Sequence, residues 1–391
     1  LIMAIYNEQE LVNLIKKIYL NVNRFIGYPI CMKPNMEGFA EWYAKTGISD
    51  IGLNNVGNPF DPEVIMLSSV AIEETVIETV APWYGIPTDK VWGFVTHSGT
   101  DGNMHGIYYG AKILQAKTGQ LPIVYISKEA HYSSFRLCDV QNLEVRLIDY
   151  DDQGSMDVED LRRKIDPTRG ALIIVAIGTT FMGGVDDQLK IQEVLDEVKP
   201  VAVYRHLDAA LFGGYLPFTE YKDIVDMSKM KYDSIAISGH KFFGVDDPCG
   251  LFLTTKDVLE AQTAFKVEYL NGDLPLINCS RNGLNPIKLY WIIKTMGYEG
   301  FKKDAEEILE NTEYMQKKLD EINYPAWHMP YSNTIFMKRP PEWICKKYSL
   351  ANGYHPHFGG ELSHVVVMQH VKPAIIDEYV DDLKQSMQEE K

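Results

Sequence analysis

The chain has 391 residues, of which 46% are hydrophobic and 24% are charged. This composition is typical of a globular protein with one large domain and a smaller companion, and it excludes a disordered or fibrous chain. The formal net charge of −16 opposes binding to a phosphate backbone, and no cluster of basic and aromatic residues overrides that sign. We therefore expect no nucleic-acid partner.

The spacing of the cysteines and the length of the apolar runs indicate where in the cell the protein is located. The five cysteines are scattered and lack CxxC spacing, so the sequence predicts neither a disulfide framework nor a zinc site. Residues 1–10 include Asn7, Glu8 and Glu10, which argues against a signal peptide. The longest strongly apolar runs, such as residues 171–177, are too short to cross a bilayer. We expect a cytoplasmic protein without a membrane partner.

Short apolar runs alternate with helical periods, which is typical of an α/β protein with a mostly parallel sheet. We expect an N-terminal helical segment over residues 1–50, a large domain over 51–285 and a small C-terminal domain over 286–391, with the boundary near Pro286. The predicted strands of the large sheet are residues 123–127, 172–176, 201–207, 234–238 and 250–253. The small domain is expected to contain a long amphipathic helix over 301–322, a strand over 364–368 and a last helix from about Pro373.

The first candidate site segment, residues 96–103, has the sequence Thr-His-Ser-Gly-Thr-Asp-Gly-Asn and opens a helical stretch. Small hydroxyl and glycine residues at a helix N-terminus suit a phosphate, although such a turn is often only a helix cap. Two polar segments follow the predicted strands 123–127 and 172–176. The first is residues 128–133, Lys-Glu-Ala-His-Tyr-Ser, which contains His131, and the second is residues 178–180, Gly-Thr-Thr, which ends at Thr180. The alternatives for these two segments are a structural histidine and a strand-ending turn.

Two further strand ends carry more specific chemistry. Residues 204–210, Tyr-Arg-His-Leu-Asp-Ala-Ala, end at Asp208 and two small residues that let a flat ring approach the backbone. Residues 234–241, Ser-Ile-Ala-Ile-Ser-Gly-His-Lys, end in a turn that carries Lys241. A desolvated lysine amine commonly forms a Schiff base with pyridoxal 5′-phosphate (PLP), which also needs a carboxylate at its ring nitrogen. Alone, the lysine would be a surface residue and the aspartate a cap, but their combination favours PLP.

Together these segments resemble the group II PLP-dependent decarboxylases, a branch of the fold-type I (aspartate aminotransferase-like) enzymes. Residues 92–103, 233–241, 248–250, 280–283 and 364–368 are similar to the histidine decarboxylase and serine decarboxylase branch. The resemblance covers nearly the whole chain. It implies an α/β fold with a mostly parallel seven-stranded sheet in the large domain, a small α+β C-terminal domain, and an active site at a homodimer interface.

The resemblance also implies the reaction: decarboxylation of an L-amino acid to its amine and CO2, with L-histidine to histamine as the first candidate. L-Serine, giving ethanolamine, and other amino acids are alternative substrates. An aminotransferase or other lyase on the same scaffold, or a catalytically silent PLP-binding protein, also stays open.

Roles for individual residues follow from the same resemblance. Lys241 would carry PLP as a Schiff base, Asp208 would hold the pyridine nitrogen, and His131 would stack on the ring. The proton returned to the substrate Cα would come from Tyr269, His131 or Lys241, and the substrate would also contact Asn55. The other cofactor-binding residues would be Ser98, Gly99, Thr100, Ser238 and His240 around the phosphate, Thr180 near the phenolic oxygen or the substrate carboxylate, and Ala210 against the opposite ring face.

Three segments depart from the family pattern. Asp101 stands where the branch has Glu, Val245-Asp246-Asp247 where it has a Pro-containing stretch, and residues 271–276 where it has a Thr-rich run. Asp246 and Asp247 are either a solvated turn or charges that favour a cationic substrate such as histidine. His355, His357 and His364 lack an acidic or cysteine ligand at metal-site spacing, so we expect surface histidines and no metal.

Overall fold

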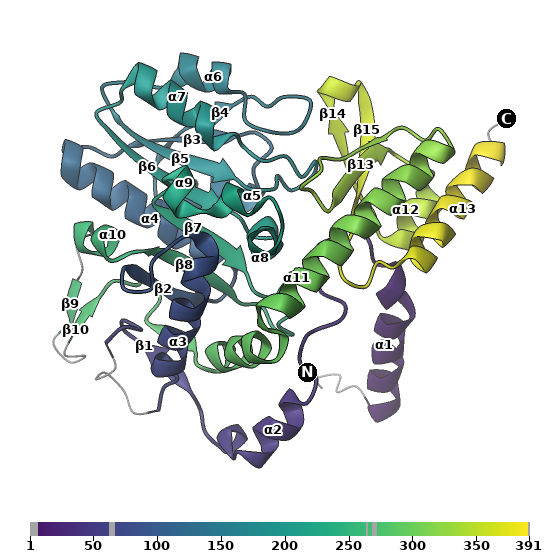
Figure 1. Ribbon diagram of the computed structural model, residues 1–391, viewed down its shortest axis with the longest axis horizontal. Coiled ribbons are helices and arrows are strands. Elements are labelled where there is room, and N and C mark those ends of the chain that lie inside the picture. The colour runs from purple at the N-terminus through teal and green to yellow at the C-terminus, as the bar shows by residue number, and fades with distance from the viewer. Residues whose placement is uncertain (1–6, 62–66, 263–264, 268–271, 390–391) are drawn as a thin grey trace, which may run out of the picture.

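The computed structural model describes residues 7–61, 67–262, 265–267 and 272–389. Its centre is a seven-stranded sheet in the order β2-β8-β7-β6-β5-β3-β4 (Figure 1). Strand β8 runs antiparallel to both its neighbours, and the other neighbouring pairs are parallel. The strands are β2 (Val91–Thr96), β3 (Ile123–Ser127), β4 (Glu144–Ile148), β5 (Gly170–Ala176), β6 (Ala202–Asp208), β7 (Ser234–Ser238) and β8 (Gly250–Thr255). The expected α/β fold is confirmed, and β3 and β7 have the predicted bounds.

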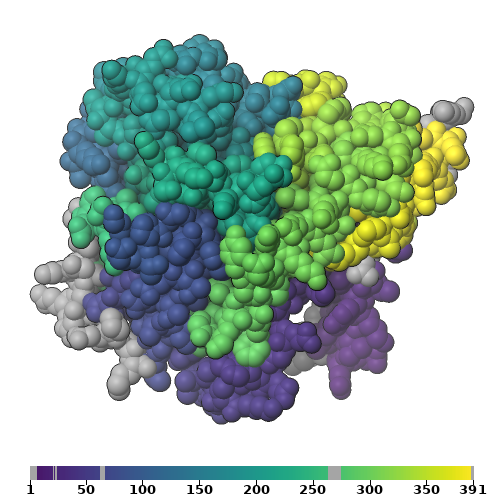
Figure 2. All heavy atoms as spheres, in the orientation of Figure 1, coloured from purple at the N-terminus to yellow at the C-terminus, as the bar shows by residue number. Residues whose placement is uncertain are grey.

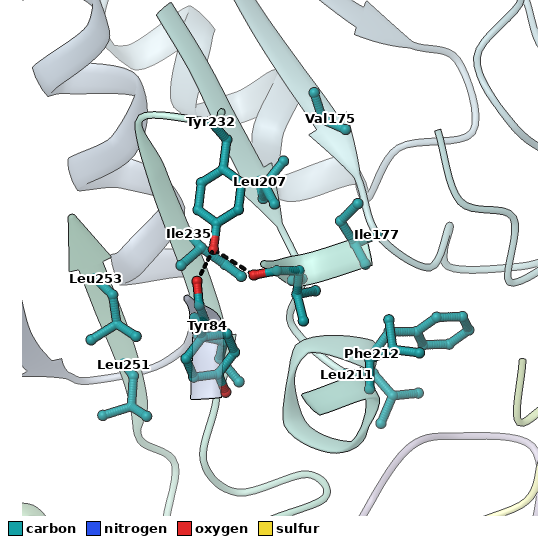
Figure 3. Packing of buried hydrophobic residues seen from close by; sticks show 14 of the residues in the cluster. Tyr84, Val175, Ile177, Leu207, Leu211, Phe212, Tyr232, Ile235, Leu251 and Leu253 are labelled. Carbon is teal, nitrogen blue, oxygen red and sulfur yellow. Dashed lines mark hydrogen bonds between the residues drawn. The ribbon is translucent and has the colours of Figure 1, made fainter. Parts of the chain in front are cut away.

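Both faces of this sheet are covered by helices. Because side chains alternate along a strand, Ile173 and Val175 of β5 join one buried cluster while Leu172 and Ile174 join another. Figure 3 shows the first cluster, where side chains from neighbouring strands gather around Tyr232. Its helices include α3 (Val70–Val80), α6 (Val158–Lys164), α7 (Gln188–Val198) and α8 (Phe212–Tyr215), and the second cluster is covered by α4 (Gly99–Thr118) and α5 (Tyr132–Val140).

Glycines allow α4 to lie directly on the strands. A Cβ added at Gly106 would lie 2.2 Å from Nδ1 of His206 on β6, and one at Gly102 would lie 2.8 Å from the Cβ of Ala236 on β7. No side chain fits at these separations. The close approach fixes the helix against β6 and β7 and brings its first turn to the edge where those strands end.

The C-terminal part of the chain forms a second core. Figures 1 and 2 show this part, in green and yellow, beside the large domain. Its antiparallel sheet has the order β12-β13-β15-β14. The first part of the long helix α11 packs on the large core, and its end joins the second core through Met315 and Leu319. The elements are α11 (Leu284–Glu321), β12 (Ala326–Trp327), β13 (Thr334–Lys338), α12 (Glu342–Tyr348), β14 (Ala351–His355), β15 (Gly360–Val366) and α13 (Pro373–Glu389).

Helix α11 differs from its prediction because it begins before residue 301. Gly297 has φ 61°, a left-handed conformation that interrupts the helical period. The sequence pattern therefore indicated only the part after this kink. The expected domain boundary near Pro286 falls in the first turn of α11, whereas the change from the first core to the second follows Ile308.

The N-terminal part contains α1 (Glu8–Asn21) and α2 (Phe39–Lys45). Helix α1 projects below the second core, where Figure 2 shows it in purple. Several of its apolar side chains are exposed, including Leu11, Ile18 and Leu20. Over the described ranges, no helix combines the length and the apolar character that a membrane span requires.

A buried polar network joins the early loop to the large domain. Strand β1 (Asn54–Val56) pairs with β11 (Ser280–Asn282), which places Asn55 opposite Arg281. The Arg281 guanidinium lies 2.9 Å from a carboxylate oxygen of Glu73 on α3, and both side chains are almost fully buried. The Asn55 amide donates to the same carboxylate at 2.8 Å. Because the interior has a low dielectric constant, neither charge is stable there without the other.

We expect Arg281→Met to lower the free energy of unfolding by about 3–5 kcal/mol, because the Glu73 carboxylate stays buried without its cation. Urea unfolding followed by circular dichroism measures the change. Lys45→Met, which removes the exposed pair between Lys45 and Glu41, is the matched control and should leave stability nearly unchanged. Equal losses in the two variants would contradict a special role for the buried pair.

Candidate active site

The predicted site segments meet at one edge of the large sheet. In the parallel register Ala176 pairs with Asp208, and Asp208 pairs with Ala236. The carboxyl ends of β5, β6 and β7 therefore lie side by side, which is where α/β proteins bind ligands. A cavity of about 490 Å³ opens at this edge. Among its lining residues are Ser98, Gly99, Thr100, His131, Thr180, Asp208, Ala210, Ser238, His240 and Lys241.

Helix α4 begins at this cavity. Ser98 is its N-cap and accepts a hydrogen bond from the Asp101 N–H at 3.3 Å. A Cβ added at Gly99 would lie 2.5 Å from Ser238 Oγ and 3.3 Å from the Ala210 Cβ. The helix start, the end of β7 and the turn after β6 thus form one tight cradle. The positive end of a 20-residue helix suits an anion at this place.

An amine, a carboxylate and an imidazole share the cavity. Burial lowers the pKa of the Lys241 amine, and the nearby Asp208 carboxylate partly opposes that shift. Burial also lowers the pKa of His131, which Asp208 raises and Lys241 lowers further. All three residues line the same cavity, and the pKa of each base responds to the charge of Asp208. A lowered pKa gives Lys241 a larger neutral, nucleophilic fraction than an exposed lysine has.

The two histidines of the cavity are fixed by hydrogen bonds. His131 caps α5: its Nδ1 accepts from the Ser133 N–H at 3.3 Å and lies 2.7 Å from Ser133 Oγ. In the neutral ring the proton is therefore on Nε2. His240 has its Nδ1 2.9 Å from the Cys249 carbonyl oxygen, and burial lowers its pKa.

One described residue among the predicted ones, Asn55, is not among those that line the cavity. Asn55 is fully buried, and its amide group is bonded to Ser69 and Glu73 in the network beside β11. A direct contact between Asn55 and a substrate in this cavity would require that network to break. Tyr269 lies outside the described residues, so its position stays a prediction.

The sequence interpretation missed several lining residues. Tyr28, Pro29 and Ile30 come from the segment after α1, and Thr334 and Val366 come from β13 and β15. These residues have no polar motif of their own and reach the cavity only through tertiary contacts. Asn103 also lines it, with its Oδ1 2.9 Å from His206 Nε2. Its signal in the sequence is its spacing of four from Gly99, which places both on one face of α4.

The acidic turn after Lys241 has a partner. Asp246 lies 2.8 Å from the ammonium of Lys288 on α11, and Asp247 contacts the same ammonium. The Lys288 side chain is buried, whereas both acids are partly exposed. The two acids therefore hold α11 against the turn, and the single ammonium balances one of their two charges.

The expectation of surface histidines in the small domain is wrong for two of the three. His355 and His364 are buried, and only His357 is exposed. The expectation followed from the absence of further metal ligands at suitable spacing, but the Phe181 ring of the loop after β5 stacks on both buried histidines. Over the part of the chain that the structure describes, no group of three His, Cys, Asp or Glu side chains is arranged to hold a metal.

Comparison with known proteins matches this site to one family. Residues 109–331 match the pyridoxal-dependent decarboxylase conserved domain. The chain belongs to this family. A histidine decarboxylase of Mesorhizobium japonicum is 32% identical, with 88% of each chain covered. Serine decarboxylase 3 of Oryza sativa subsp. japonica is also 32% identical, over 93% of this chain and 78% of that protein.

Solved structures agree on the fold. L-Methionine decarboxylase from Streptomyces sp. 590 superposes with a TM-score of 0.83 at 18% identity, covering 98% of this chain and 97% of that chain. Glutamate decarboxylase of Lactobacillus brevis gives a TM-score of 0.79 at 19% identity, covering 99% of this chain and 94% of that chain. The fold is that of the fold-type I enzymes.

Family membership makes the protein a PLP-dependent carboxy-lyase of the histidine and serine decarboxylase branch. The residues present fit this cofactor. The cavity combines a buried lysine amine, a carboxylate, an imidazole and a helix N-terminus, and its cradle is closed to a side chain at Gly99. These are the groups that an aldehyde, a pyridine nitrogen, an aromatic ring and a phosphate require.

Proposed function

We propose that this enzyme decarboxylates L-histidine to histamine. The similarity to several histidine decarboxylases over most of the chain carries this proposal. L-Serine is the second candidate, since the rice serine decarboxylases are equally similar. The lining residues offer hydroxyl and aromatic side chains near the Lys241 amine, among them Tyr132, Ser133 and Thr334, which suit either a polar ring or a hydroxymethyl group.

Each site residue that the sequence predicted in this cavity has a proposed role. Lys241 attaches the cofactor through its amine, Asp208 keeps a proton on the pyridine nitrogen, and His131 lies against one ring face with Ala210 against the other. Ser98, Gly99, Thr100, Ser238 and His240 bind the phosphate, and Thr180 lies near the phenolic oxygen or the substrate carboxylate. When bound, PLP supplies the electron sink that makes loss of the carboxylate possible.

The proton that replaces CO2 has three proposed sources. His131 carries its proton on Nε2 when neutral, because Nδ1 accepts the Ser133 N–H. The buried Lys241 amine is a second donor, and Tyr269 is the third. Replacement of His131 or Tyr269 by a residue that lacks a proton donor distinguishes these two from each other and from Lys241, since only the donor's loss should slow reprotonation at Cα.

We expect the PLP-loaded protein to release CO2 and histamine from L-histidine faster than it acts on L-serine, L-methionine, L-glutamate or L-tryptophan. Amine chromatography with CO2 detection measures this. Lys241→Ala should abolish turnover and the visible absorbance of bound PLP, because no amine remains to attach the cofactor. Lys302→Ala, an exposed lysine on α11, is the control and should retain both.

Other outcomes of this assay identify the alternatives. A faster reaction with L-serine would favour the second candidate. Keto-acid formation would contradict decarboxylation altogether. A protein that binds PLP through Lys241 but acts on no amino acid would be a catalytically silent member of the family.

We expect Gly99→Ala to weaken PLP binding, because the new Cβ would meet Ser238 Oγ at 2.5 Å inside the phosphate cradle. Overpacking costs about 1–3 kcal/mol, which corresponds to a roughly 5- to 150-fold loss of affinity. Fluorescence titration of the apoenzyme with PLP measures the dissociation constant. Gly52→Ala, where a Cβ has open space, is the control and should bind like the unmodified chain.

We also propose that the enzyme is a homodimer in the cytoplasm. The exposed apolar side chains of α1 support the dimer, since a second copy would bury them. The free state of all five cysteines is compatible with a reducing compartment.

Sedimentation equilibrium tests the dimer. We expect a mass of about twice 44.5 kDa for the unmodified chain. Ile18→Glu should shift the population toward monomer because it places a charge on the apolar face of α1, where Ile18 is 67% exposed. Val201→Glu, at a 60% exposed position before β6, is the control. A monomeric unmodified chain would contradict the proposal.

A further inference from the structure

His364 is a buried histidine where three separate segments meet. It lies on β15 and is 3% exposed. Its Nδ1 is 2.8 Å from the carbonyl oxygen of Phe181, in the loop after β5, and its Nε2 is 2.9 Å from that of Gly27, in the segment after α1. A neutral imidazole donates one N–H at a time, and a protonated ring donates to both carbonyls.

Each of these segments contributes to the wall of the active-site cavity. Tyr28 follows Gly27, Thr180 precedes Phe181, and Val366 lies two residues after His364, and all three line the cavity. A single imidazole therefore joins the N-terminal segment, the large-domain loop and the small-domain strand directly behind the surfaces that they present to a ligand.

Ring stacking supports the same junction. The Phe181 ring stacks on His364, with centroids 4.7 Å apart, and on His355, with centroids 4.4 Å apart. Nδ1 of His355 lies 3.7 Å from a carboxylate oxygen of Glu129, two residues before His131. Phe181 is thus held between two buried histidines, and the second one reaches the strand end that carries His131.

The N-terminal segment has a second attachment next to His364. The Val366 N–H donates to the Ile26 carbonyl at 2.8 Å. This backbone bond does not depend on the imidazole. Loss of the imidazole should therefore let the cavity walls move relative to one another while the segment stays attached.

We propose that His364 is a positioning residue that sets the spacing of three walls of the substrate cavity and thereby controls amino-acid binding and selectivity. This inference rests on the proposed function only in that the amino acid enters this cavity. It concerns whichever amino acid the enzyme prefers. The residues that His364 holds in place line the cavity, and His364 itself needs no contact with the substrate.

The test compares His364→Leu and His364→Gln with the PLP-loaded unmodified enzyme. His364→Leu should raise KM for the preferred amino acid and lower kcat/KM about 10- to 100-fold, because displacement of binding groups by about 1 Å has such effects. The ratio of kcat/KM between the preferred and the next-best amino acid should fall. His364→Gln keeps a side-chain N–H donor and should recover part of the loss, while the PLP dissociation constant stays nearly constant in both variants.

His370→Leu is the matched control. His370 is half-buried, and its Nε2 lies 2.9 Å from the carbonyl of Phe25 in the same N-terminal segment. Like His364, His370 contacts a backbone carbonyl of the N-terminal segment, but it does not join that segment to the loop after β5. We expect a lower melting temperature with unchanged KM and selectivity. If His364→Leu also lowers only the melting temperature, the proposal is wrong.

Two further outcomes are distinguishable. If His364→Leu does not fold, His364→Gln carries the test, and an unchanged KM in that variant overturns the proposal. If the unmodified enzyme turns over no amino acid, the proposed function fails on its own. Calorimetric binding of L-histidine methyl ester to the PLP-loaded variants then tests His364, and equal affinity in the unmodified and Leu variants overturns the inference.

Discussion

The register of three parallel strands is the constraint on which the site depends. Ala176, Asp208 and Ala236 are neighbours across β5, β6 and β7, so the turns that follow these strands must share one edge. A one-residue slip would turn every side chain of a strand to the opposite face. Asp208 would then point away from the cavity, and the carboxylate would be lost to Lys241 and His131. The fully buried β5 fixes this register, because any shift would expose or overpack apolar side chains on both faces.

Within that frame, the electrostatics of the cavity favour covalent chemistry at Lys241. Burial makes the amine less basic, which helps it to act as a nucleophile. Asp208 works against that effect and limits it, and it acts on His131 in the same direction. The Asp208 carboxylate therefore raises the pKa of both nitrogen bases and offsets part of the lowering by burial. A pocket without it would lower the pKa of both groups further and would offer no anionic partner for a protonated ring nitrogen.

The sequence predicted the local parts of this arrangement and missed those built by distant contacts. Strands β3 and β7 had their predicted bounds because apolar runs end there at polar turns. Asp208, Lys241 and His131 could be proposed because each follows such a run. In contrast, Tyr28 and Val366 carry no chemical signal, and buried His364 contacts Gly27, a residue near the other end of the chain. The sequence analysis expected His364 at the surface because no further metal ligand stands at suitable spacing, and the tertiary contacts show that it is buried.

The placement of charge also limits how the substrate can be recognised. Asp246 and Asp247 share the ammonium of Lys288, and neither is among the described residues that line the cavity. Among the described residues that line the cavity, Asp208 is the one carboxylate, and the proposed cofactor engages it. An imidazole side chain would therefore have to bind in its neutral form, through hydroxyl groups and aromatic contacts. Because a free imidazole is largely neutral above its pKa of about 6.5, selection by shape and hydrogen bonding is compatible with a histidine substrate at neutral pH. It follows that selectivity depends on the exact spacing of the cavity walls more than on charge, which is the property that a junction such as His364 would govern.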